Sequence, residues 1–142
     1  MPKAEKKPGS LDPQDRKSPA GMFHILLVED DGYFRKILKQ ELSEWFPSIM
    51  IEEATGSQEA MEKMNSFTPQ IVFMDIRLPG ESGLELTRRI KAMYPAIEVL
   101  MLTSHDLPEY RQAATECGAS HFFVKGTSDG SEIKSIVESF LK

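Results

Sequence analysis

Hydrophobic residues along the chain gather in short runs that alternate with longer segments of mixed polarity. Several runs, such as residues 71–74 and 99–102, consist almost entirely of aliphatic residues, phenylalanine and methionine. Continuous apolar runs of this length are typical of strands that are covered on both faces of a sheet. We therefore predict five strands, at residues 23–29, 49–54, 70–75, 97–102 and 121–124.

The segments between the predicted strands repeat their apolar residues every three to four positions, which is the period of an amphipathic helix. Asp31 and Ser57 are predicted to cap the first two helices, because short polar side chains bond the free N–H groups there. Pro95 is predicted to end the third helix and Gly118 the fourth, and an apolar stripe over residues 133–141 indicates a fifth. This alternation of strands and helices favours a parallel α/β sheet with helices on both faces.

The first 21 residues differ in composition from the rest of the chain. They contain four prolines and several lysines, with Leu11 as the one large apolar residue after the initial methionine. Such a segment buries too little apolar surface to offset the entropy lost on ordering. We predict that residues 1–21 form a disordered or flexible tail and that residues 22–142 form a single domain.

The net charge of −5 is unevenly distributed. Residues 1–21 carry five Lys or Arg and three Asp or Glu, so the remainder carries a net charge of −7. An acidic body argues against direct nucleic-acid binding and suits carboxylates that hold a cation. No apolar run approaches the roughly 20 residues that span a bilayer, and the single cysteine, Cys117, cannot form an internal disulfide. We expect a cytoplasmic protein without membrane contact.

Polar side chains with complementary chemistry follow the predicted strands. Glu29 and Asp30 follow the first strand and Asp75 ends the third, while Thr103 and Lys125 follow the fourth and fifth. The carboxyl ends of parallel strands meet at one edge of the sheet, where such folds bind their ligands. Crowded carboxylates repel each other unless a cation or a proton intervenes, and hard oxygen ligands of this kind suit Mg2+. A carboxylate nucleophile beside a metal, a hydroxyl and an ammonium matches a site for phosphoryl transfer.

Four segments carry a resemblance to a known family. They read ILLVEDD at 25–31, IVFMDIRLPGESGLEL at 71–86, VLMLTS at 99–104 and GASHFFVKG at 118–126. In this order and spacing they resemble the receiver domain of bacterial two-component response regulators, and the wording is most similar to receivers of helix-turn-helix regulators of the NarL/LuxR type. The resemblance implies a flavodoxin-like, doubly wound (βα)5 fold with a five-stranded parallel sheet in the order 2-1-3-4-5.

The resemblance also assigns the metal and phosphorylation chemistry to particular residues. It implies that Asp75 is the phosphoacceptor and that Asp30 and Asp75 bind Mg2+ directly. Glu29 is expected to bind the ion through water, and the backbone carbonyl of Arg77 to supply a further ligand. Mg2+ is therefore the expected cofactor.

The same resemblance implies roles for three residues around the phosphoryl group. Thr103 is the expected switch hydroxyl, Lys125 the expected phosphate-binding lysine and Phe122 the expected switch aromatic. Many receivers carry a cis-proline after the lysine, whereas Gly126 follows Lys125 here. The resemblance therefore extends to the lysine but not to that turn.

These expectations describe a phosphoacceptor switch in a two-component phosphorelay. Its partner is expected to be a sensor histidine kinase or a phosphotransfer protein. The receiver itself is expected to catalyse at most its own aspartyl phosphorylation and dephosphorylation. Self-association is expected through the face of the fourth helix, fifth strand and fifth helix. The alternative is a receiver that serves as an interaction module of a larger transcriptional regulator, whose C-terminal DNA-binding domain is absent here.

Other classes of protein fit the sequence less well. Phosphatases with an aspartate nucleophile carry a second acid two residues further on, where this chain has Arg77. A degenerate receiver would lack part of the set of acidic pair, acceptor, hydroxyl and lysine, all of which are present. A flavin- or nucleotide-binding protein of the same architecture would need a glycine-rich phosphate loop after the first strand, where this chain has acidic residues.

Overall fold

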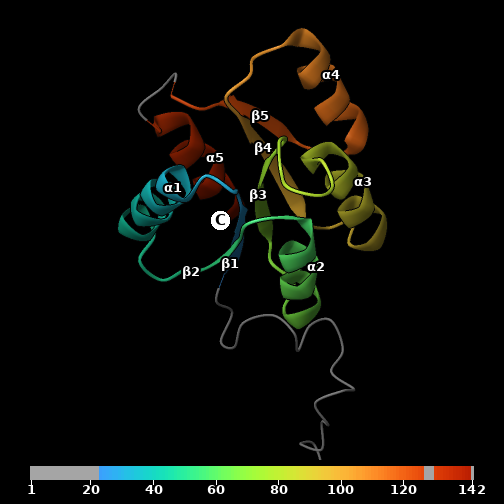
Figure 1. Ribbon diagram of the computed structural model, residues 1–142. Coiled ribbons are helices and arrows are strands. Elements are labelled where there is room, and N and C mark those ends of the chain that lie inside the picture. Colours follow the sequence, from blue (N-terminus) through green and yellow to red (C-terminus); the bar gives the residue numbers. More distant parts are fainter. Residues whose placement is uncertain (1–22, 127–129, 142) are drawn as a thin grey trace, which may run out of the picture.

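The structure is a computed structural model that describes residues 23–126 and 130–141. Within these ranges, five strands alternate with five helices, as the sequence predicts (Figure 1). The predicted tail of residues 1–21 lies outside the described residues. The elements are β1 (His24–Val28), α1 (Gly32–Trp45), β2 (Met50–Ala54), α2 (Ser57–Ser66), β3 (Ile71–Asp75), α3 (Gly83–Met93), β4 (Glu98–Thr103), α4 (Pro108–Cys117), β5 (His121–Val124) and α5 (Ser131–Leu141).

All the strands are parallel and lie in the order β2-β1-β3-β4-β5. This order confirms the expected flavodoxin-like fold. Because the first crossover leads outward to β2 and the later ones lead to the other side of β1, the chain reverses its direction of winding between β1 and β3. The strands end at the edge where the chain turns into each following helix, and such an edge at a reversal of winding is where α/β folds bind ligands.

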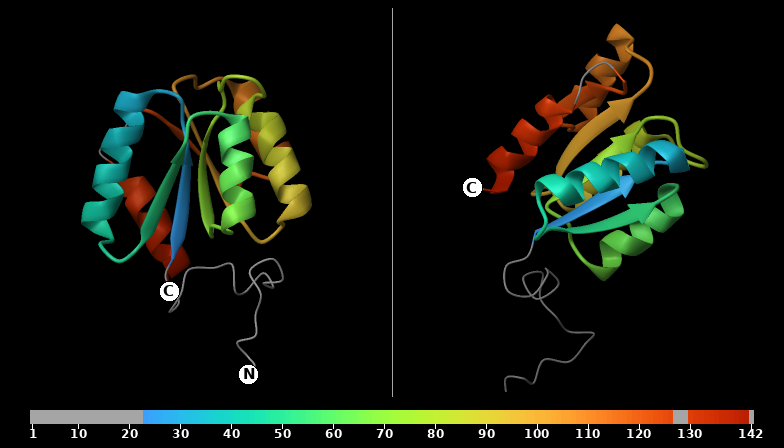
Figure 2. Two further views of the ribbon diagram at one scale, coloured as in Figure 1. Left: turned by 60° about the horizontal axis from the view of Figure 1, so that its bottom comes forward. Right: turned by 90° about the vertical axis from the view of Figure 1, so that its left-hand side faces the viewer.

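Side chains along the central strands point alternately to two separate apolar layers. Leu26 and Val28 of β1 face a layer that α2, α3 and α4 cover, whereas Ile25 and Leu27 face a layer that α1 and α5 cover. The two groups of helices lie on opposite sides of the sheet in Figure 2. Both faces of β3 and β4 are thus buried, which explains why their sequences are continuous apolar runs and do not alternate with polar residues.

The ends of the helices confirm three sequence predictions and correct one. The Asp31 side chain accepts hydrogen bonds from two N–H groups at the start of α1, α3 ends directly before the Tyr94–Pro95 pair, and α4 closes at Gly118 with a φ of 105°. The prediction that Ser57 caps α2 is wrong: Gly56 occupies the capping position, and Ser57 is the first helical residue. No helix in the described part of the chain is both long and apolar enough to cross a membrane.

Candidate functional site

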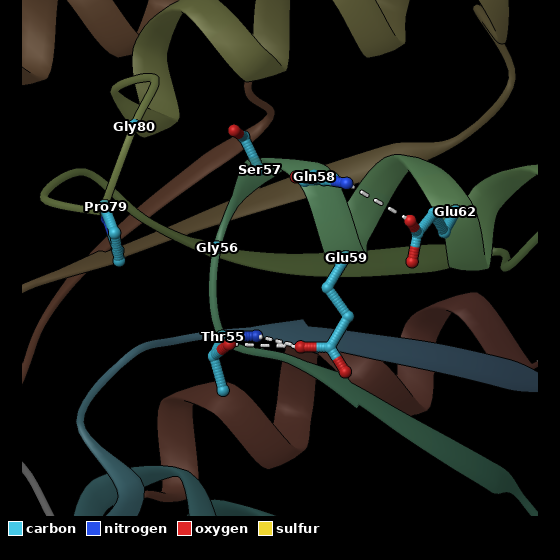
Figure 3. A pocket seen from close by; sticks show the side chains of 8 residues that line it. All are labelled: Thr55, Gly56, Ser57, Gln58, Glu59, Glu62, Pro79 and Gly80. Carbon is cyan, nitrogen blue, oxygen red and sulfur yellow. Dashed lines mark hydrogen bonds between the residues drawn. The ribbon is translucent and has the colours of Figure 1, made fainter.

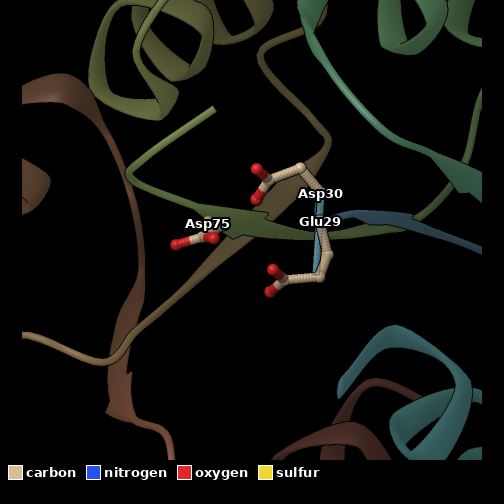
Figure 4. Close-up of side chains that lie close together, drawn as sticks. All are labelled: Glu29, Asp30 and Asp75. Atoms are coloured by element: carbon tan, nitrogen blue, oxygen red, sulfur yellow. The ribbon is translucent and has the colours of Figure 1, made fainter. Parts of the chain in front are cut away.

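Three carboxyl groups meet at the carboxyl ends of β1 and β3. Asp75 is the last residue of β3, and Glu29 and Asp30 follow β1 directly. One oxygen from each of the three side chains lies within 4.8 Å of the others (Figure 4). Glu29 and Asp75 are buried, whereas Asp30 is exposed and faces solvent. The structure therefore brings together the acidic residues that the sequence analysis selected.

The ammonium group of Lys125 lies between two of these carboxylates. Its Nζ atom is 2.6 Å from Glu29 Oε1 and 3.3 Å from Asp75 Oδ2. The backbone N–H of Lys125 donates to the carbonyl of Thr103 at 2.8 Å, which fixes the turn after β5 beside the end of β4. The ring of Phe34 lies 4.7 Å from Nζ and adds a cation–π contact. The structure thus brings Lys125 together with Glu29 and Asp75, while its role in binding phosphate stays a prediction.

Burial and the neighbouring charges shift the pKa values of Glu29 and Lys125. Burial, aided by repulsion from Asp75, raises the pKa of Glu29 to about 7, although Lys125 and the N–H of Asp31 oppose this shift. Burial lowers the pKa of Lys125, but its contacts with Glu29 and Asp75 outweigh this effect, so the pKa lies above its ordinary value. Carboxylates that cannot all be satisfied by one ammonium are a site for a further cation.

The two carboxylate oxygens of Glu29 have different partners. Its Oε2 accepts a hydrogen bond from the N–H of Asp31 at 3.0 Å. Its buried Oε1 lies 2.6 Å from the Lys125 ammonium. This carboxylate, beside two aspartates, fits a hard divalent cation that is bound directly or through water.

Thr103 and Phe122 lie on the next two strands of the sheet, β4 and β5. Thr103 is fully buried at the end of β4, and its Oγ1 accepts a hydrogen bond from the N–H of His105 at 3.2 Å. Phe122 is half-buried in β5, and the guanidinium carbon of Arg111 lies 4.6 Å from the centre of its ring. Arg111 is held in turn by Asp106 at 2.7 Å.

The loop after Asp75 turns back toward it. The N–H of Arg77 lies 3.4 Å from Asp75 Oδ1, while the role of the Arg77 carbonyl as a metal ligand stays a prediction. Next to this loop lies an open hollow of about 590 Å³, which is lined in part by Asp30, Arg77 and Tyr110. Gly126, which takes the place of the proline common in receivers, adopts a positive φ of 78° that suits glycine.

A second hollow, of about 440 Å³, lies between the start of α2 and the same loop (Figure 3). Its carboxylates already have partners, because Glu59 accepts from both the N–H and the hydroxyl of Thr55, and Glu62 from the amide of Gln58. No side-chain hydrogen bond caps the start of α2 at Gly56. None of the predicted site residues lines this hollow.

Sequence reasoning missed several residues that contact the site. Phe34 and Arg35 lie on α1, and they contact Lys125 and the carbonyl of Glu29, respectively. Arg111 on α4 covers Phe122. No motif or spacing points to these three residues, since each reaches the site only through the way its helix packs on the sheet.

Comparisons with known proteins agree with this geometry. Residues 25–138 match the family model of the response regulator receiver domain. The chain is 34% identical over 116 residues to the transcriptional regulatory protein LnrK of Bacillus subtilis. The aligned region covers 82% of this chain and 53% of LnrK. The chain spans about half, or less, of the length of the first transcriptional regulators that it matches.

Two solved structures are similar at more than the level of the fold. A two-component response regulator of the LuxR family from Aurantimonas sp. is 32% identical, with a TM-score of 0.76 over 85% of this chain and 86% of that one. TrrA from Thermotoga maritima, solved in complex with Mg2+ and BeF, is 31% identical, with a TM-score of 0.73 over 83% of this chain and 98% of that one. The chain therefore belongs to the response regulator receiver domains, the phosphoacceptor domains of two-component signalling.

Proposed function

We propose that Asp75 is the phosphoacceptor of this receiver domain and that the reaction requires Mg2+. The observation that carries the proposal is the convergence of three carboxylates within 4.8 Å of one another, with the Lys125 ammonium 3.3 Å from Asp75. Asp30, Asp75 and the carbonyl of Arg77 would hold the ion, and Glu29 would bind it through water. The bound ion would neutralise charge on the phosphoryl oxygens.

The side chains of the chain perform the remaining steps. A carboxylate oxygen of Asp75 attacks the phosphorus of a phosphohistidine, so that a P–O bond forms as the P–N bond breaks and the electron pair stays on the imidazole nitrogen. Lys125, whose ammonium lies 3.3 Å from Asp75, would bind a phosphoryl oxygen as a point charge. The exposed side of the site at Asp30 and the adjoining hollow give the donor access.

We further propose that phosphorylation changes one surface of the domain. Thr103 would turn its hydroxyl toward the phosphoryl group, and the ring of Phe122 would move into the space that the Thr103 side chain leaves. Both residues lie on neighbouring strands at the β4–β5 side of the sheet, where Met101 pairs with Phe122. The face made by α4, β5 and α5 would then be the output surface and the surface for self-association.

The partners of the full protein follow from the same proposal. A sensor histidine kinase or a phosphotransfer protein would donate the phosphoryl group. Since several relatives are transcriptional regulators that are longer than this chain, the receiver would act within a regulator that has a DNA-binding domain. The receiver itself is expected not to bind DNA, because its acidic body lacks the positive charge that dominates such binding.

The test is phosphorylation by acetyl phosphate, followed by intact-mass measurement. The wild type should gain one phosphoryl group in the presence of Mg2+ and none in the presence of a chelator. Asp75→Asn should gain none, whereas Asp31→Asn should react like the wild type, because asparagine caps a helix as well as aspartate does. Equal phosphorylation of the wild type and Asp75→Asn would refute the assignment.

Calorimetry separates the two members of the acidic pair. Asp30→Ala should weaken Mg2+ binding more than Glu29→Ala, because Asp30 is the proposed direct ligand. A larger loss from Glu29→Ala would reverse their roles.

A further inference from the structure

Arg35 connects the acidic turn to the neighbouring strand. It lies in the first turn of α1, and 18% of its side chain is exposed. Its Nη1 donates to the carbonyl oxygen of Glu29 at 2.6 Å, and its Nε donates to Glu53 Oε1 at 2.8 Å. One planar guanidinium therefore holds a backbone group of the site and a side chain of β2 at the same time.

The carbonyl that Arg35 binds belongs to the peptide between Glu29 and Asp30. The N–H on the other side of Glu29 donates to the carbonyl of Ala54 at 2.9 Å, so β2 already fixes that end of the residue. Arg35 fixes the other end, and the orientation of this peptide sets where the next side chain, that of Asp30, begins. Asp30 is exposed and has little packing of its own to define its position.

Glu53 is the anchor of this arrangement. Besides Arg35, it accepts a hydrogen bond from Lys39 Nζ at 2.8 Å. The hydrogen bond from Lys39, together with that from Arg35, lowers the pKa of Glu53, so its carboxylate stays ionised. Among the described residues, Lys39 shares the anchor with Arg35 but does not contact the acidic turn. Both cations therefore bind Glu53, but Arg35 is the one that also holds the carbonyl of Glu29.

We propose that Arg35 is a positioning residue of the metal site, which orients the Glu29–Asp30 peptide so that the Asp30 carboxylate faces Asp75. This inference rests on the proposed Mg2+ site. Two physical effects of Arg35 on a bound cation have opposite signs. Its positive charge opposes a second cation, so removing the charge alone should strengthen Mg2+ binding. Its hydrogen bond orders a ligand, so removing it should weaken binding.

The sign of the change in Mg2+ affinity distinguishes these effects. Calorimetric titrations of the wild type, Arg35→Gln and Lys39→Gln at the same ionic strength would measure it. We expect about a tenfold loss of affinity in Arg35→Gln, the lower end for groups that orient metal ligands. Lys39→Gln, which removes the same charge from the same anchor, should bind Mg2+ as tightly as the wild type or slightly more tightly.

Arg35→Lys separates charge from geometry. A lysine restores the charge, but its single ammonium cannot span Glu29 and Glu53 as the guanidinium does. We therefore expect Arg35→Lys to bind Mg2+ more weakly than the wild type, with much of the loss of affinity that Arg35→Gln shows. An affinity equal to that of the wild type in Arg35→Lys, or equal losses in Arg35→Gln and Lys39→Gln, would overturn the inference.

A measurement without metal tests the inference independently of the proposed function. The ¹⁵N chemical shift and the exchange rate of the Asp30 amide report on the peptide that Arg35 binds. Both should change in Arg35→Gln and stay as in the wild type in Lys39→Gln, whereas a general loss of stability would not single out this amide. An unchanged Asp30 amide in Arg35→Gln would overturn the inference, whether or not the wild type binds Mg2+. A wild type that binds no Mg2+ would refute the proposed function and would leave the amide result as the test of the inference.

Discussion

Gly83 lies at the start of α3, close against the backbone of Asp75 and Ile76. It is the first residue of α3, and its N–H donates to the carbonyl of Ile76 at 2.7 Å. A β-carbon added at Gly83 would lie 1.9 Å from the carbonyl oxygen of Asp75 and 2.8 Å from its carbonyl carbon. Both are backbone atoms, so no side-chain rotation can relieve the overlap.

We therefore predict that Gly83→Ala is strongly destabilising. Nonbonded carbon contacts are optimal at about 3.5–4.0 Å, so α3 would have to move away from β3 by on the order of 1.5 Å. Overpacking typically costs about 1–3 kcal/mol, and a clash with backbone atoms should lie at the upper end, about 3 kcal/mol. This is a large part of the roughly 5–15 kcal/mol that stabilises a domain.

Gly32 offers a matched control, because it is the first residue of α1 as Gly83 is of α3. A β-carbon at Gly32 would have Arg35 Nη2 as its nearest neighbour, at an ordinary distance of 3.8 Å. Gly32→Ala should therefore stabilise the protein by about 0.4–1 kcal/mol, since alanine restricts the unfolded chain.

Urea unfolding curves of both variants measure these opposite effects as shifts of the midpoint at a constant slope. Phosphorylation of Gly83→Ala by acetyl phosphate should also be slower, because the displaced carbonyl belongs to the proposed phosphoacceptor. A midpoint for Gly83→Ala equal to that of the wild type, or equal destabilisation by both alanines, would refute the packing argument.

Three further predictions concern other parts of the domain. Tryptophan fluorescence should hardly change on Mg2+ binding, because Trp45 ends the 14-residue α1, about 20 Å along the helix from the site; a saturable quench that is lost in Asp30→Ala would contradict this. Asp31→Ala should lower the free energy of unfolding in urea by about 1 kcal/mol, since the N–H groups of Tyr33 and Phe34 lose their acceptor, and an unchanged midpoint would contradict it. Burial raises the pKa of the Cys117 thiol, so a thiol reagent should react slowly with native protein at neutral pH and rapidly in urea, whereas equal rates would argue for an exposed thiol.

The acidic part of the site could be predicted because its chemistry is local in the sequence. Asp75 and the Glu29–Asp30 pair directly follow apolar runs, and the carboxyl ends of parallel strands meet at one edge whatever the details of packing. The strands were predicted to within about one residue. For β1, β3 and β4 the reason is that continuous burial leaves a continuous apolar run. The strand order came from the family resemblance and not from the pattern, because periodicity says which face is buried but not which strand is the neighbour.

The contacts that orient the site were decided by the tertiary structure alone. Arg35 reaches the Glu29 carbonyl, Phe34 lies on Lys125 and Arg111 covers Phe122, yet each is an ordinary helix residue in the sequence. The capping position of α2 was predicted one residue too late, because the chain enters the helix from an extended Gly56 and Ser57 is already helical. Such contacts depend on the rotation of each helix against the sheet, and this rotation is set by the packing of both apolar layers together, which no local stretch of sequence encodes.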